Sequence, residues 1–132
     1  METELEQDIK ALISGIPLVR LVLLFGSLSC GEGRSDSDLD LAIAGPYPLT
    51  AEEKTVLIES LAVISGRPVD LIDLQVAGGV ILHEALTRGK LIYCSDRALY
   101  GEIIKKMLFD QTDMMPYRER ILAERRREWI GV

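Results

Sequence analysis

Two short apolar runs, joined by a polar segment, do most to limit how this chain can fold. The first run closes on Gly26 and Ser27, and ten residues later Asp38 and Asp40 open the second run. Short apolar runs of this kind predict buried strands. Because side chains alternate along a strand, Asp38 and Asp40 are expected to share one face.

Two carboxylates side by side at the start of a core strand repel each other and resist desolvation. A bound hard cation with oxygen ligands, most often Mg²⁺, is the usual remedy. The Gly-Ser turn precedes a short predicted helix, and free backbone N–H groups at such a turn suit a phosphate group. The residues therefore predict a site for a metal ion and a phosphate.

Size and composition narrow the class of protein. A chain of 132 residues, 48% hydrophobic and 27% charged, fits one ordered domain. The net charge of −6 disfavours nucleic acid as a direct partner. No run approaches the roughly 18 apolar residues that span a bilayer, and the acidic start is unlike a signal peptide. Two scattered cysteines predict reduced thiols, so a cytoplasmic protein is expected.

Apolar periodicity and Gly or Pro stops predict the remaining elements. Thr3 with Glu6, and Thr50 with Glu53, have the capping-box spacing at the start of two helices. Strands are expected over residues 18–25, 38–44, 69–74 and 90–94. Further helices are expected over residues 27–32 and 78–88 and from residue 96 on, where Pro116 should divide the region.

This order of elements predicts an α/β (α+β) class, with an antiparallel or mixed sheet of about four strands flanked by helices. Residues 1–95 are expected to form the core. Residues 96–132 are expected to form a helical C-terminal extension of the same domain.

The spacing of Gly26-Ser27, ten residues, and Asp38-x-Asp40 resembles the signature of the nucleotidyltransferase superfamily that includes DNA polymerase beta, and Gly31 strengthens the match. Within it, the short chain is similar to the minimal nucleotidyltransferases, the antitoxin partners of HEPN-domain toxins. The resemblance covers roughly residues 5–95 and implies a nucleotidyltransferase-type mixed sheet.

The resemblance also implies a third carboxylate on a later strand, for which Asp70 and Asp73 are the candidates. Strand alternation puts these two acids on opposite faces, so only one can join Asp38 and Asp40. The family pattern favours Asp70. Asp73 is then expected to end the strand toward solvent.

Roles for the site residues follow from the same resemblance. The implied catalytic residues and ligands of one or two Mg²⁺ ions are Asp38, Asp40 and Asp70. The implied nucleotide-binding residues are Gly26, Ser27, Arg34 and Ser37. Cys30 stands where many relatives carry a basic residue, which removes a phosphate contact. Arg34 either replaces that contact or is a solvated loop charge.

The implied function is a Mg²⁺-dependent antitoxin that transfers AMP from ATP to a hydroxyl, a tyrosine in the antitoxin relatives, of a cognate HEPN toxin and so neutralises it. Two alternatives stay open: neutralisation by direct binding alone, and addition of a nucleotide to an RNA end. A cluster of C-terminal arginines is either a solvated helix face or a docking surface for an acidic or RNA-bearing partner: Arg118, Arg120, Arg125, Arg126 and Arg127.

Overall fold

The computed structural model describes residues 3–26 and 38–113, with the side chains of residues 110–113 excepted. Eight helices and strands lie in these ranges: α1 (Glu4–Ser14), β1 (Leu21–Phe25), β2 (Leu39–Ala44), α2 (Ala51–Ser65), β3 (Val69–Asp73), α3 (Gly79–Arg88), β4 (Lys90–Cys94) and α4 (Arg97–Asp113). The α/β class and the four predicted strands are confirmed. The helix expected over residues 27–32 and the region around Pro116 lie outside the described residues.

The four strands form one mixed sheet in the order β3-β2-β1-β4. Strand β1 pairs antiparallel with both β2 and β4, whereas β2 and β3 are parallel. The parallel pair needs a crossover connection, which α2 supplies. Consequently β2 and β3 begin at the end of the sheet where β1 finishes.

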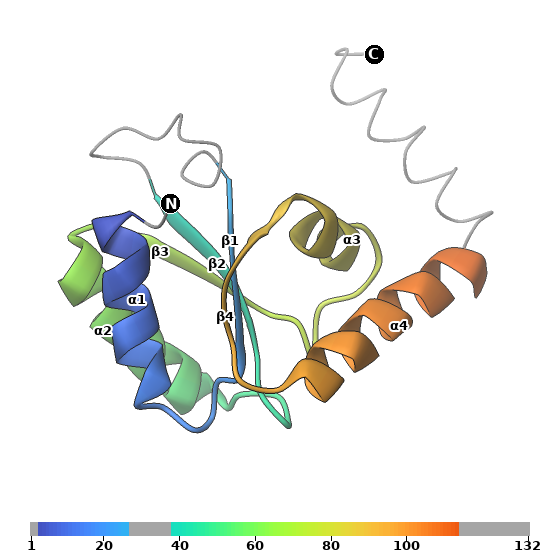
Figure 1. Ribbon diagram of the computed structural model, residues 1–132, viewed down its shortest axis with the longest axis horizontal. Helices are drawn as coiled ribbons and strands as arrows, with labels where there is room; N and C mark the ends of the chain where they lie inside the picture. The colour runs from blue at the N-terminus through green and yellow to red at the C-terminus, as the bar shows by residue number, and fades with distance from the viewer. Residues whose placement is uncertain (1–2, 27–37, 114–132) are drawn as a thin grey trace, which may run out of the picture.

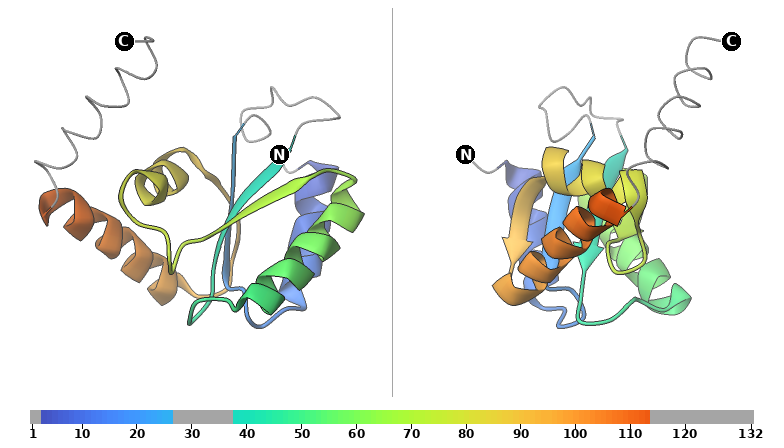
Figure 2. Two further views of the ribbon diagram at one scale, coloured as in Figure 1. Left: turned by 180° about the vertical axis from the view of Figure 1, so that it is seen from behind. Right: turned by 90° about the vertical axis from the view of Figure 1, so that its right-hand side faces the viewer.

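Helices cover both faces of the sheet. Figures 1 and 2 show α1 and α2 on one face, and α3 and α4 on the other. A core lies between each helix pair and the sheet. On the α1–α2 side it contains Ile9, Ile13, Val22, Leu24, Leu41, Ile43 and Leu61. On the α3–α4 side it contains Leu21, Leu23, Ala42, Ala44, Leu82, Ala85, Leu99, Ile103 and Met107.

The two predicted capping boxes have different outcomes. At α2 the box is complete, because Thr50 and Glu53 each accept a hydrogen bond from the other's backbone N–H. At α1 the Thr3 hydroxyl accepts from the Glu6 N–H at 3.2 Å, but the Glu6 carboxylate binds Lys90 at 3.0 Å instead. The prediction was therefore wrong for the Glu6 side chain, which is buried and ties α1 to β4.

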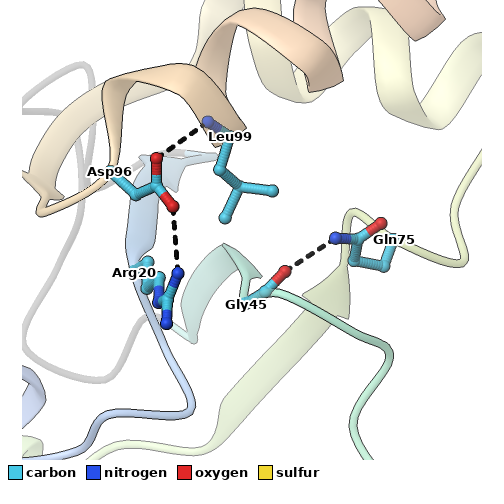
Figure 3. Close-up of polar contacts among 5 residues, drawn as sticks. All are labelled: Arg20, Gly45, Gln75, Asp96 and Leu99. Carbon is cyan, nitrogen blue, oxygen red and sulfur yellow. Dashed lines mark hydrogen bonds and ion pairs between the residues drawn. The ribbon is translucent and has the colours of Figure 1, made fainter.

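The end of the sheet where β1 begins is held by polar contacts (Figure 3). The Asp96 carboxylate accepts from the Leu99 N–H at 3.1 Å and pairs with Arg20 at 3.0 Å. These two donors, the Leu99 N–H first, lower the pKa of Asp96. The Gln75 side-chain amide donates to the Gly45 carbonyl at 2.6 Å. At this end of the sheet, the polar groups of the chain therefore form hydrogen bonds with one another.

In the described part of the chain, none of the helices has the length and apolar character needed to cross a membrane.

Candidate functional site

At the other end of the sheet, the strand register brings two predicted site residues side by side. Asp40 and Asp70 are each the second residue of a strand, and they are partners in the parallel β2–β3 pair. By strand alternation their side chains lie on the same face as Ala42 and Ile72, which belong to the α3–α4 core. The sheet therefore presents this acid pair on its α3–α4 face.

Gly26 makes room for one of these carboxylates. Asp40 is the register partner of Phe25, so Gly26 follows directly beside it. A Cβ placed on Gly26 would collide with Oδ2 of Asp40 and lie 3.2 Å from its Cγ. The backbone of Gly26 also has a φ of 79°, which disfavours any residue with a side chain. A glycine is therefore required here both by space and by conformation.

The charges of all three predicted acids meet at Asp40. Desolvation raises the pKa of this half-buried carboxyl, and the neighbouring charges of Asp70 and Asp38 raise it further. Asp38 and Asp70 are exposed. Since two neighbouring charges disfavour the ionised form of Asp40, the group has the electrostatics of a site that binds a cation. We call Asp38, Asp40 and Asp70 the acidic cluster.

The acidic cluster brings three carboxylates near one another, but its described geometry is not that of a complete set of metal ligands. Across residues 3–26 and 38–113, no three His, Cys, Asp or Glu side chains converge as metal ligands would. The donor chemistry nevertheless fits Mg²⁺, which prefers carboxylate oxygens and retains several of its own waters. A divalent cation would also relieve the repulsion that raises the pKa of Asp40.

Asp73 departs from the prediction. It was expected to face solvent, but its side chain is 8% exposed. Its carboxylate accepts hydrogen bonds from the Leu49 N–H at 2.8 Å and from the Gln75 N–H at 2.9 Å. Two backbone donors thus hold Asp73 inside the fold, on the face opposite Asp70. The Leu49 donor lies 24 residues away in sequence, so no local pattern indicated this role.

The remaining predicted nucleotide-binding residues are not placed by the structure. Ser27, Arg34 and Ser37, together with Cys30, lie outside the described residues. Their roles stay predictions. What the structure does place is Gly26, which follows β1 and lies directly beside Asp40 of the acidic cluster.

The sequence matches a known family. Residues 7–98 match the family described as "Polymerase beta, Nucleotidyltransferase". The chain is 35% identical over 85 residues to the protein adenylyltransferase MntA of Shewanella oneidensis. That alignment covers 64% of this chain and 61% of the relative, so it spans under two thirds of the relative's length.

Two solved structures share the fold over most of their length. A chain of a toxin–antitoxin complex with AMP-PNP is 28% identical, with a TM-score of 0.75 over 92% of this chain and 98% of its own. A chain of the toxin–antitoxin complex MntA-HepT is 25% identical, with a TM-score of 0.63 over 89% and 96%. The likeness therefore extends well beyond the short motif.

Proposed function

This chain belongs to the polymerase beta nucleotidyltransferase family, and we propose that it transfers AMP from ATP to a hydroxyl group of a partner protein. The observation that carries this proposal is the pairing of Asp40 with Asp70 beside Gly26. The naming of a 35% identical relative as a protein adenylyltransferase supports AMP as the group and protein as the acceptor. A similar chain solved with AMP-PNP supports an adenine nucleotide.

In this proposal the acidic cluster holds one or two Mg²⁺ ions. The bound ion would neutralise the phosphates of ATP and stabilise the charge that develops on the leaving group. Asp38 and Asp40 would hold the nucleotide-bound ion, since they lie just before and at the start of β2, beside Gly26. Asp70, which reaches the same place from β3, would complete the ligand set.

The chain's own groups would position the reactants. The backbone at Gly26 and the side chains of Ser27, Arg34 and Ser37 would hold the phosphates. Asp70 would take the proton from the acceptor hydroxyl as its oxygen bonds to the α-phosphorus. The bond from the α-phosphorus to the bridging oxygen would break, and pyrophosphate would leave. Catalysis of this kind depends mostly on positioning and charge stabilisation.

We further propose that the acceptor is a tyrosine of a cognate HEPN-type toxin, which the modification silences in the cytoplasm. Solved relatives of this chain are toxin–antitoxin complexes, which supports a toxin as the partner. The tyrosine rests on the family resemblance alone.

The test is transfer between purified proteins. The chain is incubated with its cognate partner, Mg²⁺ and ATP, and the intact mass of the partner is measured, with a matched reaction containing EDTA. We expect a mass gain equal to one or more AMP groups only when Mg²⁺ is present, and peptide mapping to place it on tyrosine. Neutralisation with no mass gain would overturn the proposal in favour of binding alone. Label on an RNA end instead of the partner would favour nucleotide addition to RNA.

A further inference from the structure

The acidic cluster occupies only part of its end of the sheet. In the strand order β3-β2-β1-β4, Asp70 lies on β3, Asp40 lies on β2 with Asp38 just before it, and Gly26 follows β1. The fourth position belongs to the start of β4, immediately after α3. Adjacent strands are about 4.8 Å apart, so β4 lies roughly 10 Å from β2 on the far side of Gly26.

One cation, Arg88, comes just before this fourth position, at the end of a helix that covers the same face as the acids. Arg88 is the last residue of α3, a helix that covers the α3–α4 face. The next residue, Gly89, lies on that side of the sheet, since a Cβ on it would lie 3.2 Å from Cβ of Leu23. Because Lys90 is the register partner of Leu24, Arg88 lies beside the end of β1. Figure 1 shows α3 returning to β4 at this end of the sheet.

The other cations of the described residues are engaged or placed elsewhere. Lys90 binds both carboxylate oxygens of Glu6 on the α1 side of the sheet. Arg20 pairs with Asp96 at the opposite end. Arg67 lies at the acid end, but it precedes β3 and so is on the far side of the acidic cluster from Gly26. The remaining cations lie on α1, α2 and α4: Lys10, Lys54, Arg97, Lys105 and Lys106.

We infer that Arg88 binds the β- and γ-phosphates of the nucleotide, an inference that rests on the proposed function. A nucleotide whose phosphates rest at Gly26 lies between the acidic cluster on one side and Arg88 on the other. Its α-phosphate must meet the acids, where transfer takes place. Its terminal phosphates then extend toward β4. A guanidinium group suits them, because it can donate two parallel hydrogen bonds to one phosphate.

Arg88 also has an ordinary structural use, which the test must separate. A cation in the last turn of a helix interacts favourably with the helix dipole. Glu84, four residues earlier on α3, is placed for a weak ion pair with it. Either use predicts that loss of Arg88 lowers the melting temperature of the ligand-free protein. Neither use predicts a change in affinity for phosphates.

The experiment measures binding by calorimetry to full-length Arg88→Ala with Mg²⁺ and three probes: ATP, inorganic tripolyphosphate and AMP. We expect about tenfold weaker binding of ATP and tripolyphosphate, and unchanged binding of AMP. In the transfer assay KM for ATP should rise about tenfold, while kcat at saturating ATP stays within about twofold. Arg88→Lys should restore most of the affinity. Arg97→Ala, an exposed arginine at the opposite end of the sheet, is the matched control and should behave as wild type.

Unchanged affinity of Arg88→Ala for ATP and tripolyphosphate, with active wild-type and Arg97→Ala proteins, would overturn this inference and leave the proposed function standing. An equal loss for AMP would also overturn it, because the contact would then not be with the terminal phosphates. Weaker ATP binding in Arg67→Ala but not in Arg88→Ala would assign the role to the other side of the acidic cluster. No transfer by the wild-type protein would instead reject the proposed function itself.

Discussion

Asp70 lies at the start of β3 and Asp73 ends the same strand, but their carboxylates differ in burial and in hydrogen bonding. Asp70 is exposed, and it adds to the repulsion at Asp40. Asp73 is buried, and it accepts two backbone hydrogen bonds that join the end of β3 to the start of α2 and to the turn before α3. One carboxylate stabilises the fold, whereas the other adds charge where charge is already crowded.

This contrast separates structural acids from acids kept for a ligand. Asp73 accepts two backbone hydrogen bonds, whereas the carboxylate of Asp40 faces the negative charges of Asp70 and Asp38. A buried carboxylate supplied with donors stabilises a fold, and one that faces like charges destabilises it. The acidic cluster should therefore matter for transfer and not for stability, and Asp73 should show the reverse.

The largest effect is expected from Asp40→Asn. Loss of the central carboxylate should lower the transfer rate by about a thousandfold or more, because the metal's charge stabilisation is lost. The ligand-free protein should melt at the same temperature or higher, since one of three crowded charges is gone. Intact-mass kinetics of the partner and thermal melting check the two parts. Full activity, or a protein that no longer folds, would contradict this view of the cluster.

The next effect distinguishes the two acids of β3 by their transfer activity. Asp70→Asn should lose about a hundredfold or more in kcat, since it would lose a ligand and proton acceptor. Asp73→Asn, assayed well below its melting temperature, should stay within about threefold of wild type. These rates are measured with the same partner and saturating ATP.

The two variants serve as controls for each other, because both remove one charge from the same strand. The opposite ranking of the two rates would assign the third carboxylate to Asp73. Equal losses would show that the charge of β3, and not the position of the acid, controls activity.

Stability should reverse that ranking. Asp73→Ala removes the acceptor for the Leu49 and Gln75 N–H groups and should lower the free energy of unfolding by about 2 to 3 kcal/mol. Asp70→Ala, at an exposed position, should change it by about 0.5 kcal/mol or less. Urea unfolding followed by circular dichroism measures both. A stable Asp73→Ala protein would show that these donors find other partners.

Local sequence signals predicted the elements well. The strand Lys90–Cys94 has the predicted bounds, and the Thr50 and Glu53 pair caps α2 as its spacing indicates. The same spacing failed for the Glu6 side chain, because its partner Lys90 lies 84 residues away in sequence. Local rules describe a helix start only where no distant group competes for the same carboxylate.

The sequence indicated which acids to examine for a site, but it did not indicate how they are arranged. Motif spacing selected Asp38 and Asp40, the family resemblance added Asp70, and alternation separated Asp70 from Asp73. The register that pairs Asp40 with Asp70 depends on contacts between strands, which no local pattern specifies. The burial of Asp73 likewise depends on a donor 24 residues away. Distant partners decide which acids become structural.

The smallest expected effect is the pH dependence that the acidic cluster gives to stability. The pKa of Asp40 is higher in the folded protein than in the unfolded chain. Between these two pKa values, the folded state therefore binds more protons than the unfolded state. Asp40 should therefore lower stability as pH rises through its folded pKa. The difference in stability between wild type and Asp40→Asn isolates this contribution.

If the acidic cluster binds Mg²⁺, the contribution of Asp40 to the pH dependence of stability changes sign. The ion binds only the ionised carboxylate, so its stabilisation of the wild-type protein should grow as pH rises through the same window. Asp40→Asn should show a much weaker Mg²⁺ effect, and Asp73→Asn the full one. Thermal melting between pH 4 and pH 7, with and without Mg²⁺, measures these differences. If Mg²⁺ stabilised wild type and Asp40→Asn equally, the ion would bind outside the acidic cluster. The chemistry proposed for that end of the sheet would then be wrong.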